Sequence, residues 1–326
     1  MKTLQEICRP IEKYLQQFEE KFIAKLKSDV ELLNKVISYV LQNRGKRFRP
    51  ILVLLTAQMT GQVNENSFQS AIMVELLHTA TLVHDDVVDE ADVRRGAPTI
   101  HKIWQNKVAI LTGDYLFAKT LLNLVEVERL DVIQILSHAA QRMSEGELLQ
   151  IERKNDFYMN EGVYFRLVAD KTASLISASC QLGAATSTDK NNGDISSYMR
   201  NFGENLGIAF QIKDDLLDYI GDESKIGKPV GKDILENKIT LPLIHALKNS
   251  DKKTSEEIIQ LIKNNPSKAD ISKIHEFVNV HGGIEFATNK ARHFANQAIH
   301  HLNAFPDSPF KASLIALTEF VTARET

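Results

Sequence analysis

A chain of 326 residues could fold as one large domain or two ordinary ones, and either arrangement can bury a substantial core. The hydrophobic share of 43% and the charged share of 25% are those of a soluble globular protein and exclude disordered and collagen-like architectures. A formal net charge of −3 gives no general attraction to nucleic acid or anionic membranes, so we expect any anionic ligand to be held by local basic residues.

The N-terminal segment and the cysteines indicate a cytoplasmic protein. After MKTLQEICRP the chain soon becomes charged, without the apolar core and cleavage site of a secretory signal. Cys8 and Cys180 fit reduced structural thiols better than a disulfide framework. No stretch approaches the roughly 20 apolar residues that a membrane-spanning helix needs, so we expect no transmembrane segment and at most peripheral contact with a membrane.

Helical periodicity dominates the chain. Most segments place apolar residues at helical spacing, no alternating strand pattern competes, and glycines and prolines mark off segments of ordinary helix length. Because no repeat, low-complexity linker or sharp change in composition interrupts the chain, the sequence predicts a single all-α domain over residues 1–326.

A basic motif lies early in the chain. GKRFRP, at residues 45–50, places Lys46, Arg47 and Arg49 near an expected helix start, where free amides and the helix dipole favour phosphate. Other cations near the acidic motifs described next are Arg94, Arg95, Lys171, Lys228, Lys232 and Lys238. Together they would neutralise a diphosphate, although for any one lysine alone a solvent-exposed role is commoner.

Two predicted helices carry the same acidic pattern. One runs from about residue 67 to 89 and the other from about 195 to 219, and both are apolar before they reach a DDxxD motif. The aspartates of the two motifs are Asp85, Asp86 and Asp89, followed by Asp214, Asp215 and Asp218. Residues i and i+4 lie on one face of a helix, so the outer aspartates of each motif can share a hard cation.

Magnesium is the cation that this pattern favours. Neighbouring carboxylates repel each other without a cation, and neither motif contains an equal number of basic residues. Oxygen-rich sites suit Mg²⁺, which commonly bridges one or two carboxylates to substrate phosphates. A lone DDxxD is a solvated acidic helix end about as often as a metal site, but two of them favour a pair of clusters that clamp a diphosphate.

Small residues lie one turn before the first acidic motif. Ala80 and Thr81 are about 6 to 7.5 Å along the helix axis from Asp85. They would leave open space beneath the acids or serve close helix packing, and periodicity alone favours packing. His78 and His84 fit structural roles equally well, and neither belongs to an HExxH zinc pattern.

A series of motifs resembles the trans-isoprenyl diphosphate synthases, or polyprenyl synthetases, in order and over essentially the whole chain. They are GKRFRP, LLHTATLVHDDVVDEADVRRG, GDYLFAKT, the KTA at Lys171, GIAFQIKDDLLDY and GKPVGKDILENKITLPL. The resemblance implies the isoprenoid synthase fold, an all-α bundle around a deep central cavity, in a homodimer. It also implies a prenyltransferase that joins isopentenyl diphosphate to geranyl, farnesyl or geranylgeranyl diphosphate.

The resemblance assigns roles to the matching residues. It implies about three Mg²⁺ ions in the active site, bound by Asp85, Asp89 and Asp214 with support from Asp86, Asp215 and Asp218. The residues implied to hold isopentenyl diphosphate are Lys46, Arg49, His78 and Arg95. Those implied around the allylic diphosphate are Arg94, Lys171, Thr172, Gln211, Lys228, Lys238 and, by a weaker match, Gln150. The reaction is expected to depend most on Asp85, Asp89, Asp214, Lys171 and Arg94.

The implied reaction explains these residue types. The allylic C–O bond breaks as charge accumulates on the departing diphosphate, the double bond of isopentenyl diphosphate attacks, and the diphosphate removes the proton, so no protein base is expected. Short-chain relatives place bulky aromatic residues one turn before the first DDxxD. Ala80 and Thr81 stand there in this chain, which predicts a long all-trans product of about C30 to C50.

Other function classes stay open. A class I terpene cyclase also uses DDxxD and Mg²⁺, but its second metal motif has an Asn/Ser/Glu pattern where this chain has DDLLD. A regulatory subunit of a heteromeric prenyl synthase often lacks one acidic cluster, whereas both are intact here. A nucleic-acid binder is disfavoured, because the basic residues are dispersed among acidic ones and no aromatic stacking platform occurs.

Overall fold

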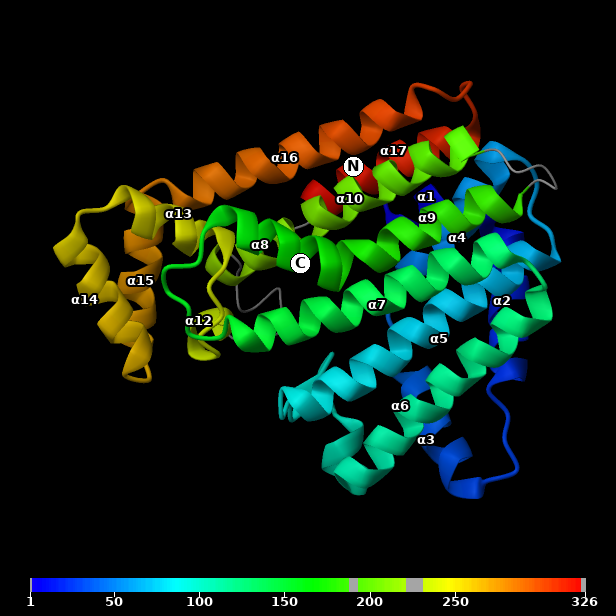
Figure 1. Cartoon of the computed structure of the whole chain (residues 1–326), viewed down its shortest axis with the longest axis horizontal. Helices are drawn as coiled ribbons and strands as arrows, with labels where there is room; N and C mark the ends of the chain where they lie inside the picture. Colours follow the sequence, from blue (N-terminus) through cyan, green and yellow to red (C-terminus); the bar gives the residue numbers. More distant parts are fainter. Residues whose placement is uncertain (1, 188–192, 221–230, 324–326) are drawn as a thin grey trace.

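The computed structural model describes residues 2–187, 193–220 and 231–323 (Figure 1). Helices make up nearly all of the regular structure in these ranges, which confirms the predicted all-α fold. The helical elements are α1 (Leu4–Cys8), η1 (Arg9–Ile11), α2 (Glu12–Lys25), α3 (Glu31–Gln42), α4 (Phe48–Thr60), α5 (Glu65–Val88), α6 (Ile100–Val127), α7 (Leu130–Glu152), α8 (Glu161–Val168), η2 (Ala169–Ala173), α9 (Ser174–Thr186), α10 (Gly193–Ile220), α12 (Lys232–Leu235), α13 (Leu241–Asn249), α14 (Lys252–Lys263), α15 (Lys268–Val280), α16 (Gly283–Leu302) and α17 (Pro309–Ala323). Two short strands, β1 (Val93–Arg94) and β2 (Ala97–Pro98), pair antiparallel between α5 and α6.

α5 is a buried helix that carries the first acidic motif. Asn64 caps its start, because the side-chain oxygen accepts a hydrogen bond from the Ser67 backbone N–H at 3.1 Å. Over residues 68–77 nearly every side chain is buried, as expected of a helix that is apolar on all faces. The helix ends just before Asp89, whose N–H bonds the Asp85 carbonyl at 2.8 Å. The motif therefore lies at the end of a firmly packed helix.

α10 carries the second acidic motif and joins two hydrophobic cores. Met199 and Phe202, in its first half, belong to the main core with side chains of α4, α5 and α9. Ile212 and Leu216, in its second half, belong to a second core with α13, α15 and α16. In Figure 1, α12 to α15 gather at the left end of the molecule. The acidic motif of α10 thus lies in the part of the helix that faces this second core.

Between α8 and α9 the helix widens into one π-helical turn, η2, which carries Lys171 and Thr172. Two glycines let neighbouring helices approach this turn. A Cβ atom at Gly146 of α7 would lie 2.6 Å from the Lys171 backbone nitrogen, and one at Gly207 of α10 would lie 2.5 Å from the Ala173 Cα atom. Because real side chains do not tolerate such distances, glycine at both positions lets α7 and α10 hold η2 between them.

A tight hairpin turn places two arginines beside the first acidic motif. The strand register pairs Arg94 with Ala97, and the residues between them, Arg95 and Gly96, have φ values of 54° and 77°. Two successive positive φ values are the geometry of a type I′ turn, which favours glycine at one of the two central positions. The Arg95 guanidinium lies against Gly45, where a Cβ atom would be 2.5 Å from it. The hairpin therefore reaches back to GKRFRP.

α6 differs from the sequence-based expectation in one respect and has an irregular backbone. Its helix is interrupted at Gln105, where φ is 71° and ψ is 162°. Among the helices of the described ranges, α6 alone is long and apolar enough to cross a membrane by length and composition, so the expectation that no stretch approaches this length was wrong. The stretch was missed because small and polar residues such as Thr112 and Gly113 interrupt its apolar side chains. The protein itself buries 39% of this window.

Candidate active site

Asp85 of the first acidic motif faces side chains of α7 and η2. Burial and the charge of Glu147 together raise the pKa of Asp85 to about 6, while Lys171 acts in the opposite direction. Repulsion from Asp89 adds to the same effect. A carboxylate with this environment gains from a nearby cation, because the cation would offset both the burial and the repulsion.

The other two aspartates of the first motif differ from each other in their surroundings. Asp86 is buried and accepts a hydrogen bond from Arg94 Nε at 2.6 Å. Asp89 is exposed at the end of α5. The structure therefore ties Asp86 to a predicted substrate-binding arginine and leaves Asp89 accessible beside Asp85.

Asp215 is the buried member of the second motif. Its carboxylate accepts hydrogen bonds from Tyr164 Oη at 2.5 Å and from Gln211 Nε2 at 2.8 Å. Burial raises the pKa of Asp215 to about 7, against the effect of these two hydrogen bonds and with repulsion from Asp214 and Asp218. Asp214, half-buried, lies one residue earlier on the helix.

Asp218 joins the end of α10 to α12. Its carboxylate accepts hydrogen bonds from the backbone N–H groups of Lys232 and Asp233 at 3.0 and 2.9 Å. Burial and repulsion from Asp215 and Asp218 raise the pKa of Asp233 well above its ordinary value. Asp233 is thus a fourth carboxylate beside the three predicted in this cluster.

η2 contacts α7 and α10 through its side chains. Lys171 Nζ donates a hydrogen bond to Gln150 Oε1 at 3.2 Å and forms an ion pair with Glu147. Thr172 Oγ1 donates to Gln211 Oε1 at 2.8 Å, and Gln211 in turn donates to Asp215. The structure therefore links Thr172 and Gln211 to the second acidic motif, and Lys171 to Gln150 on α7.

Lys238 lies within electrostatic range of both acidic clusters. It forms an ion pair with Glu236 at 2.6 Å. Burial lowers the pKa of Lys238, but the hydrogen bond and charge of Glu236, with the charges of Asp89 and Asp233, raise it above the ordinary value. One cation therefore interacts with the end of α5 and with α12.

A cluster of arginines surrounds His78. Burial lowers the pKa of His78 well below its ordinary value, and the nearby arginines 49, 95, 94 and 47 lower it further. Burial also lowers the pKa of Arg49 to about 10, and its Nε is buried without a partner. Arg47 also has one buried nitrogen without a partner, but its charge is compensated by ion pairs with Glu75 at 2.7 Å and with Glu19 at 3.0 Å. The structure thus brings Arg49, His78 and Arg95 together, and their binding of one diphosphate stays a prediction.

Four predicted residues stand apart from these contacts. Lys46 is exposed, with its Nζ 5.7 Å from the centre of the Phe320 ring of α17. Lys228 lies outside the described residues. Ala80 is buried in the main core, and Thr81 Oγ1 donates to the His78 carbonyl at 3.0 Å.

Sequence reasoning missed several side chains of this region: Glu75, Glu147, Tyr164 and Asp233. Glu147 precedes Gln150 by three residues on α7, so helical spacing could have placed it on the same face. Asp233 follows Lys232 in the motif GKPVGKDILENKITLPL, in which only lysines were predicted to contribute to the site. Tyr164 and Glu75 gave no signal, because each acts through a partner distant in the sequence.

Magnesium fits the donors of this site. Within the described ranges, no three His, Cys, Asp or Glu side chains are close enough together to hold a metal ion by themselves. Mg²⁺ usually takes one or two carboxylates and completes its coordination with water and substrate phosphates. Asp85 and Asp89 offer such a pair, and Glu147 Oε1 is buried without a hydrogen-bond partner. These donors suit a cation that arrives with a diphosphate.

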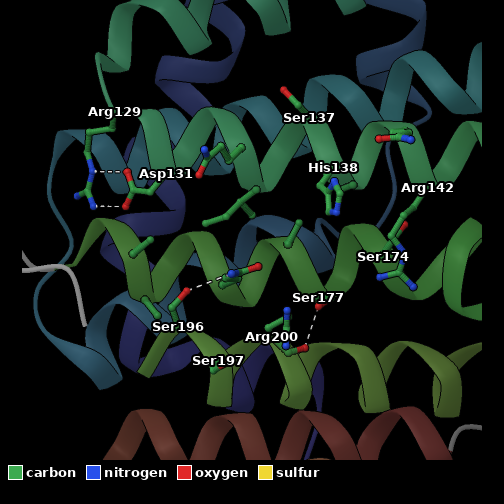
Figure 2. Close-up of a pocket in the computed structure, with 18 residues that line it drawn as sticks. Arg129, Asp131, Ser137, His138, Arg142, Ser174, Ser177, Ser196, Ser197 and Arg200 are labelled. Carbon is green, nitrogen blue, oxygen red and sulfur yellow. Dashed lines mark hydrogen bonds and ion pairs between the residues drawn. The ribbon is translucent and has the colours of Figure 1, made fainter. Parts of the chain in front are cut away.

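A separate groove runs along the outer side of α7, α9 and α10 (Figure 2). Its volume is about 920 Å³, and it includes none of the predicted site residues. Ser177 and Ala178 of α9 line it between Arg142 of α7 and Arg200 of α10. The acidic motifs therefore do not open into this groove.

Comparison with known proteins identifies the family. A family model described as polyprenyl synthetase matches residues 30–278. The chain is 34% identical to the octaprenyl diphosphate synthase of Escherichia coli (strain K12) over 93% of each chain. It is 35% identical to the heptaprenyl diphosphate synthase component 2 of Bacillus subtilis (strain 168), over 94% of this chain and 87% of that protein.

A solved structure agrees with this assignment. The polyprenyl synthase from Caulobacter crescentus CB15, complexed with calcium and isoprenyl diphosphate, superposes with a TM-score of 0.93 at 32% identity, covering 99% of this chain and 98% of that one. The resemblance inferred from the motifs is thereby confirmed. The chain is a prenyltransferase that belongs to the polyprenyl synthetase family.

Proposed function

We propose that this protein condenses isopentenyl diphosphate with an allylic prenyl diphosphate, with the help of Mg²⁺, and releases a long-chain all-trans polyprenyl diphosphate and diphosphate. The observation that carries the proposal is that cations lie beside both acidic clusters: Lys171 interacts with Asp85, and Lys238 interacts with Asp89 and with Asp233, whose backbone N–H binds Asp218 of the second motif. Carboxylates and cations so arranged can hold a diphosphate together with divalent ions.

The allylic diphosphate would lie between α5 and α10. Bound Mg²⁺ would offset the negative charge that accumulates on the departing diphosphate. Lys171, Thr172 and Lys238 would donate hydrogen bonds to the oxygens of this diphosphate. To do so they would leave their present partners, which are Gln150, Gln211 and Glu236. Arg94, held by Asp86, would reach the diphosphate from the hairpin. The C–O bond breaks as this charge is stabilised.

Isopentenyl diphosphate would lie in the arginine cluster. Arg49 and Arg95 would bind its diphosphate, and His78, neutral because its pKa is lowered, would donate a ring N–H without adding charge. Lys46 would close the pocket from the side of α17. The double bond then attacks the allylic carbon, and the departing diphosphate removes the proton. Apolar helix walls would keep out water, which otherwise traps the carbocation.

We propose that the absence of bulk at Ala80 and Thr81 permits the long product. Both residues lie one turn before Asp85 on α5. The side chains of residues 70–77, farther from Asp85 on the same helix, are all buried. A growing tail that passes Ala80 and Thr81 would run along α5 into the main core. The long-chain names of the two curated relatives support this direction.

We also propose that the protein acts as a homodimer through α6. Its exposed side carries apolar residues at helical spacing, which are Ile110, Leu111, Phe117, Leu121, Leu122 and Val125. Their exposed fractions run from 41% to 72%, and a stripe of this kind is typical of a protein interface. The cytoplasm is the compartment we propose, and it agrees with two free, buried cysteines.

The decisive experiment is an elongation assay with the purified chain alone. Isopentenyl diphosphate, Mg²⁺ and each of geranyl, farnesyl and geranylgeranyl diphosphate are supplied, and products are read by mass spectrometry. We expect elongation only when both diphosphates are present, and loss of turnover in Asp85→Ala and after metal chelation. A cyclase would consume the allylic diphosphate alone. A chain that needs a second protein for activity would be a subunit of a heteromeric synthase.

A further inference from the structure

Asp170 directly precedes Lys171 in η2, but its side chain pairs with Arg142, which lines the groove of Figure 2 and not the candidate active site. It accepts a hydrogen bond from Arg142 Nε at 2.7 Å. The same arginine binds Glu204 of α10 through both terminal nitrogens, at 3.0 and 2.8 Å. Arg142 therefore ties three elements together at once: α7, η2 and α10.

The geometry of this arginine is that of a firm contact. Two parallel N–H donors bind one carboxylate, while Nε binds the other, which uses the planar fork of the guanidinium fully. The side chains of Arg142, Asp170 and Glu204 are only 29%, 15% and 29% exposed. Figure 2 shows Arg142 at one end of the groove, with Ser174 beside it. Ser174 Oγ in turn donates to the Asp170 carbonyl at 2.6 Å.

The inner contacts of η2 cannot hold the turn during the reaction. Lys171 is bound to Glu147 and Gln150, and Thr172 to Gln211. A diphosphate that binds Lys171 and Thr172 must compete with these contacts. The contacts of Asp170 lie outside the substrate site, so they persist when the inner ones are lost.

We propose that Arg142 is a positioning residue for the allylic diphosphate, which fixes η2 from its outer side and so keeps Lys171 and Thr172 in place when substrate binds. The inference rests on the proposed function. Close packing at Gly146 and Gly207 leaves η2 little room to move toward either neighbouring helix, so a small displacement is the expected result of losing Arg142. Displacements of this size at a substrate-binding group reduce the rate steeply.

Arg142→Met tests the proposal, because methionine keeps much of the side-chain length and removes both ion pairs. We expect the kcat/KM for the allylic diphosphate to fall by about tenfold or more, while the KM for isopentenyl diphosphate stays within about twofold. Arg129→Met is the matched control. Arg129 lines the other end of the same groove and pairs with Asp131 at 3.0 Å, so we expect neither constant to change.

Asp170→Asn serves as a second variant if Arg142→Met fails to fold. It weakens the contact with η2 and leaves the pairing of Arg142 with Glu204, so α7 and α10 stay joined. The same selective loss for the allylic diphosphate is expected. The positioning role would be overturned if the KM for isopentenyl diphosphate rose by as much as the kcat/KM for the allylic diphosphate fell. It would also be overturned if a folded variant kept the wild-type kcat/KM for the allylic diphosphate. Failure of the wild-type chain to elongate any primer would instead refute the proposed function.

Discussion

The arginines of the basic cluster differ in how their charges are compensated. Arg47 is bound by Glu75 and Glu19 and lies 4.6 Å from the centre of the Phe22 ring. Each of the two guanidinium groups has one buried nitrogen without a partner, but no carboxylate of the described residues forms an ion pair with Arg49. An unpaired buried donor is costly unless a ligand satisfies it. Arg47 therefore stabilises the fold, and Arg49 is available to bind an anion.

The contrast between these arginines predicts separate effects. Arg49→Met should raise the KM for isopentenyl diphosphate by about a hundredfold, since it removes a buried charged donor, with little change for the allylic diphosphate. Arg47→Met leaves Glu75 buried without its partner and should lower the melting temperature instead. Steady-state kinetics with each substrate varied, beside thermal unfolding, measures both. A similar KM change in the two variants would contradict the assignment.

The length of the product is predicted to depend on the side chain at residue 80. Ala80→Phe should shorten the product, because the ring would fill the space one turn below Asp85. Ala80 is 2% exposed, so some loss of stability from overpacking is expected as well. Mass spectrometry of the products measures the length. Val280→Phe adds the same ring at a position that is 71% exposed and should leave the product unchanged. An unaltered product with Ala80→Phe would sink the assignment.

At the scale of single elements, α6 contains a strained backbone position at Gln105. Gln105 lies at φ 71° and ψ 162°, a region that is essentially restricted to glycine. The break separates a first turn, which ends at Trp104, from the long remainder of α6. Trp104 packs edge-on against Tyr39 at 5.4 Å, and Ile100 and Ala109 lie in the same small core. Packing on both sides of Gln105 therefore maintains a conformation that the residue itself disfavours.

Gln105→Gly should stabilise the protein. Relief of backbone strain, on the order of 1–3 kcal/mol, exceeds the greater entropy loss of glycine, so a net gain of about 1 kcal/mol is expected. Thermal or urea unfolding measures the change. Gln105→Ala keeps a Cβ atom and should give no such gain. A glycine variant that is less stable than wild type would show that the Gln105 side chain contributes more than the strain costs.

Sequence patterns predicted the two acidic helices closely, because each has a continuous apolar stretch that ends in a distinctive motif. α5 and α10 extend over residues 65–88 and 193–220, against predicted ranges of about 67–89 and 195–219. The π-helical turn and the break at Gln105 were not predictable. They depend on Gly146, Gly207 and Trp104, whose contacts come from other parts of the chain. Local spacing carries no information about such contacts.

The candidate site divides in the same way. Motifs identified the charged residues that project from α5, η2 and α10, and the structure joins Thr172 and Gln211 to Asp215 and places Lys171 near Asp85. Tyr164, Glu147 and Asp233 modify those residues from elements whose own sequences are unremarkable. Asp86 illustrates the limit: the DDxxD spacing groups it with Asp85, but its hydrogen bond with Arg94 separates their environments.

At the scale of the whole molecule, α10 contributes side chains to the main core and to the second core, which supports the proposal of a single domain. The exposed apolar side of α6 supports the proposed dimer. Because water contact with such a surface is unfavourable, two copies that cover it gain stability.

The proposed dimer can be tested by placing negative charges on the exposed apolar side of α6. The double substitution of Leu122 and Val125, which are 59% and 72% exposed, by glutamate should halve the mass measured by light scattering. Both side chains point to solvent, so the fold should survive. Val280→Glu places a charge on an equally exposed residue of α15 and should leave the mass unchanged. Dimers that persist in the double variant would exclude α6 as the interface.

α17 closes the main core against the other end of the chain. Ser313 Oγ donates to the Ile7 carbonyl at 2.7 Å, and Leu314 and Leu317 are fully buried among side chains of the first helices. The ribosome makes α17 after every other described helix. The apolar surface that receives α17 therefore stays uncovered until α17 itself has been made and has packed against it, which leaves the unfinished chain open to aggregation.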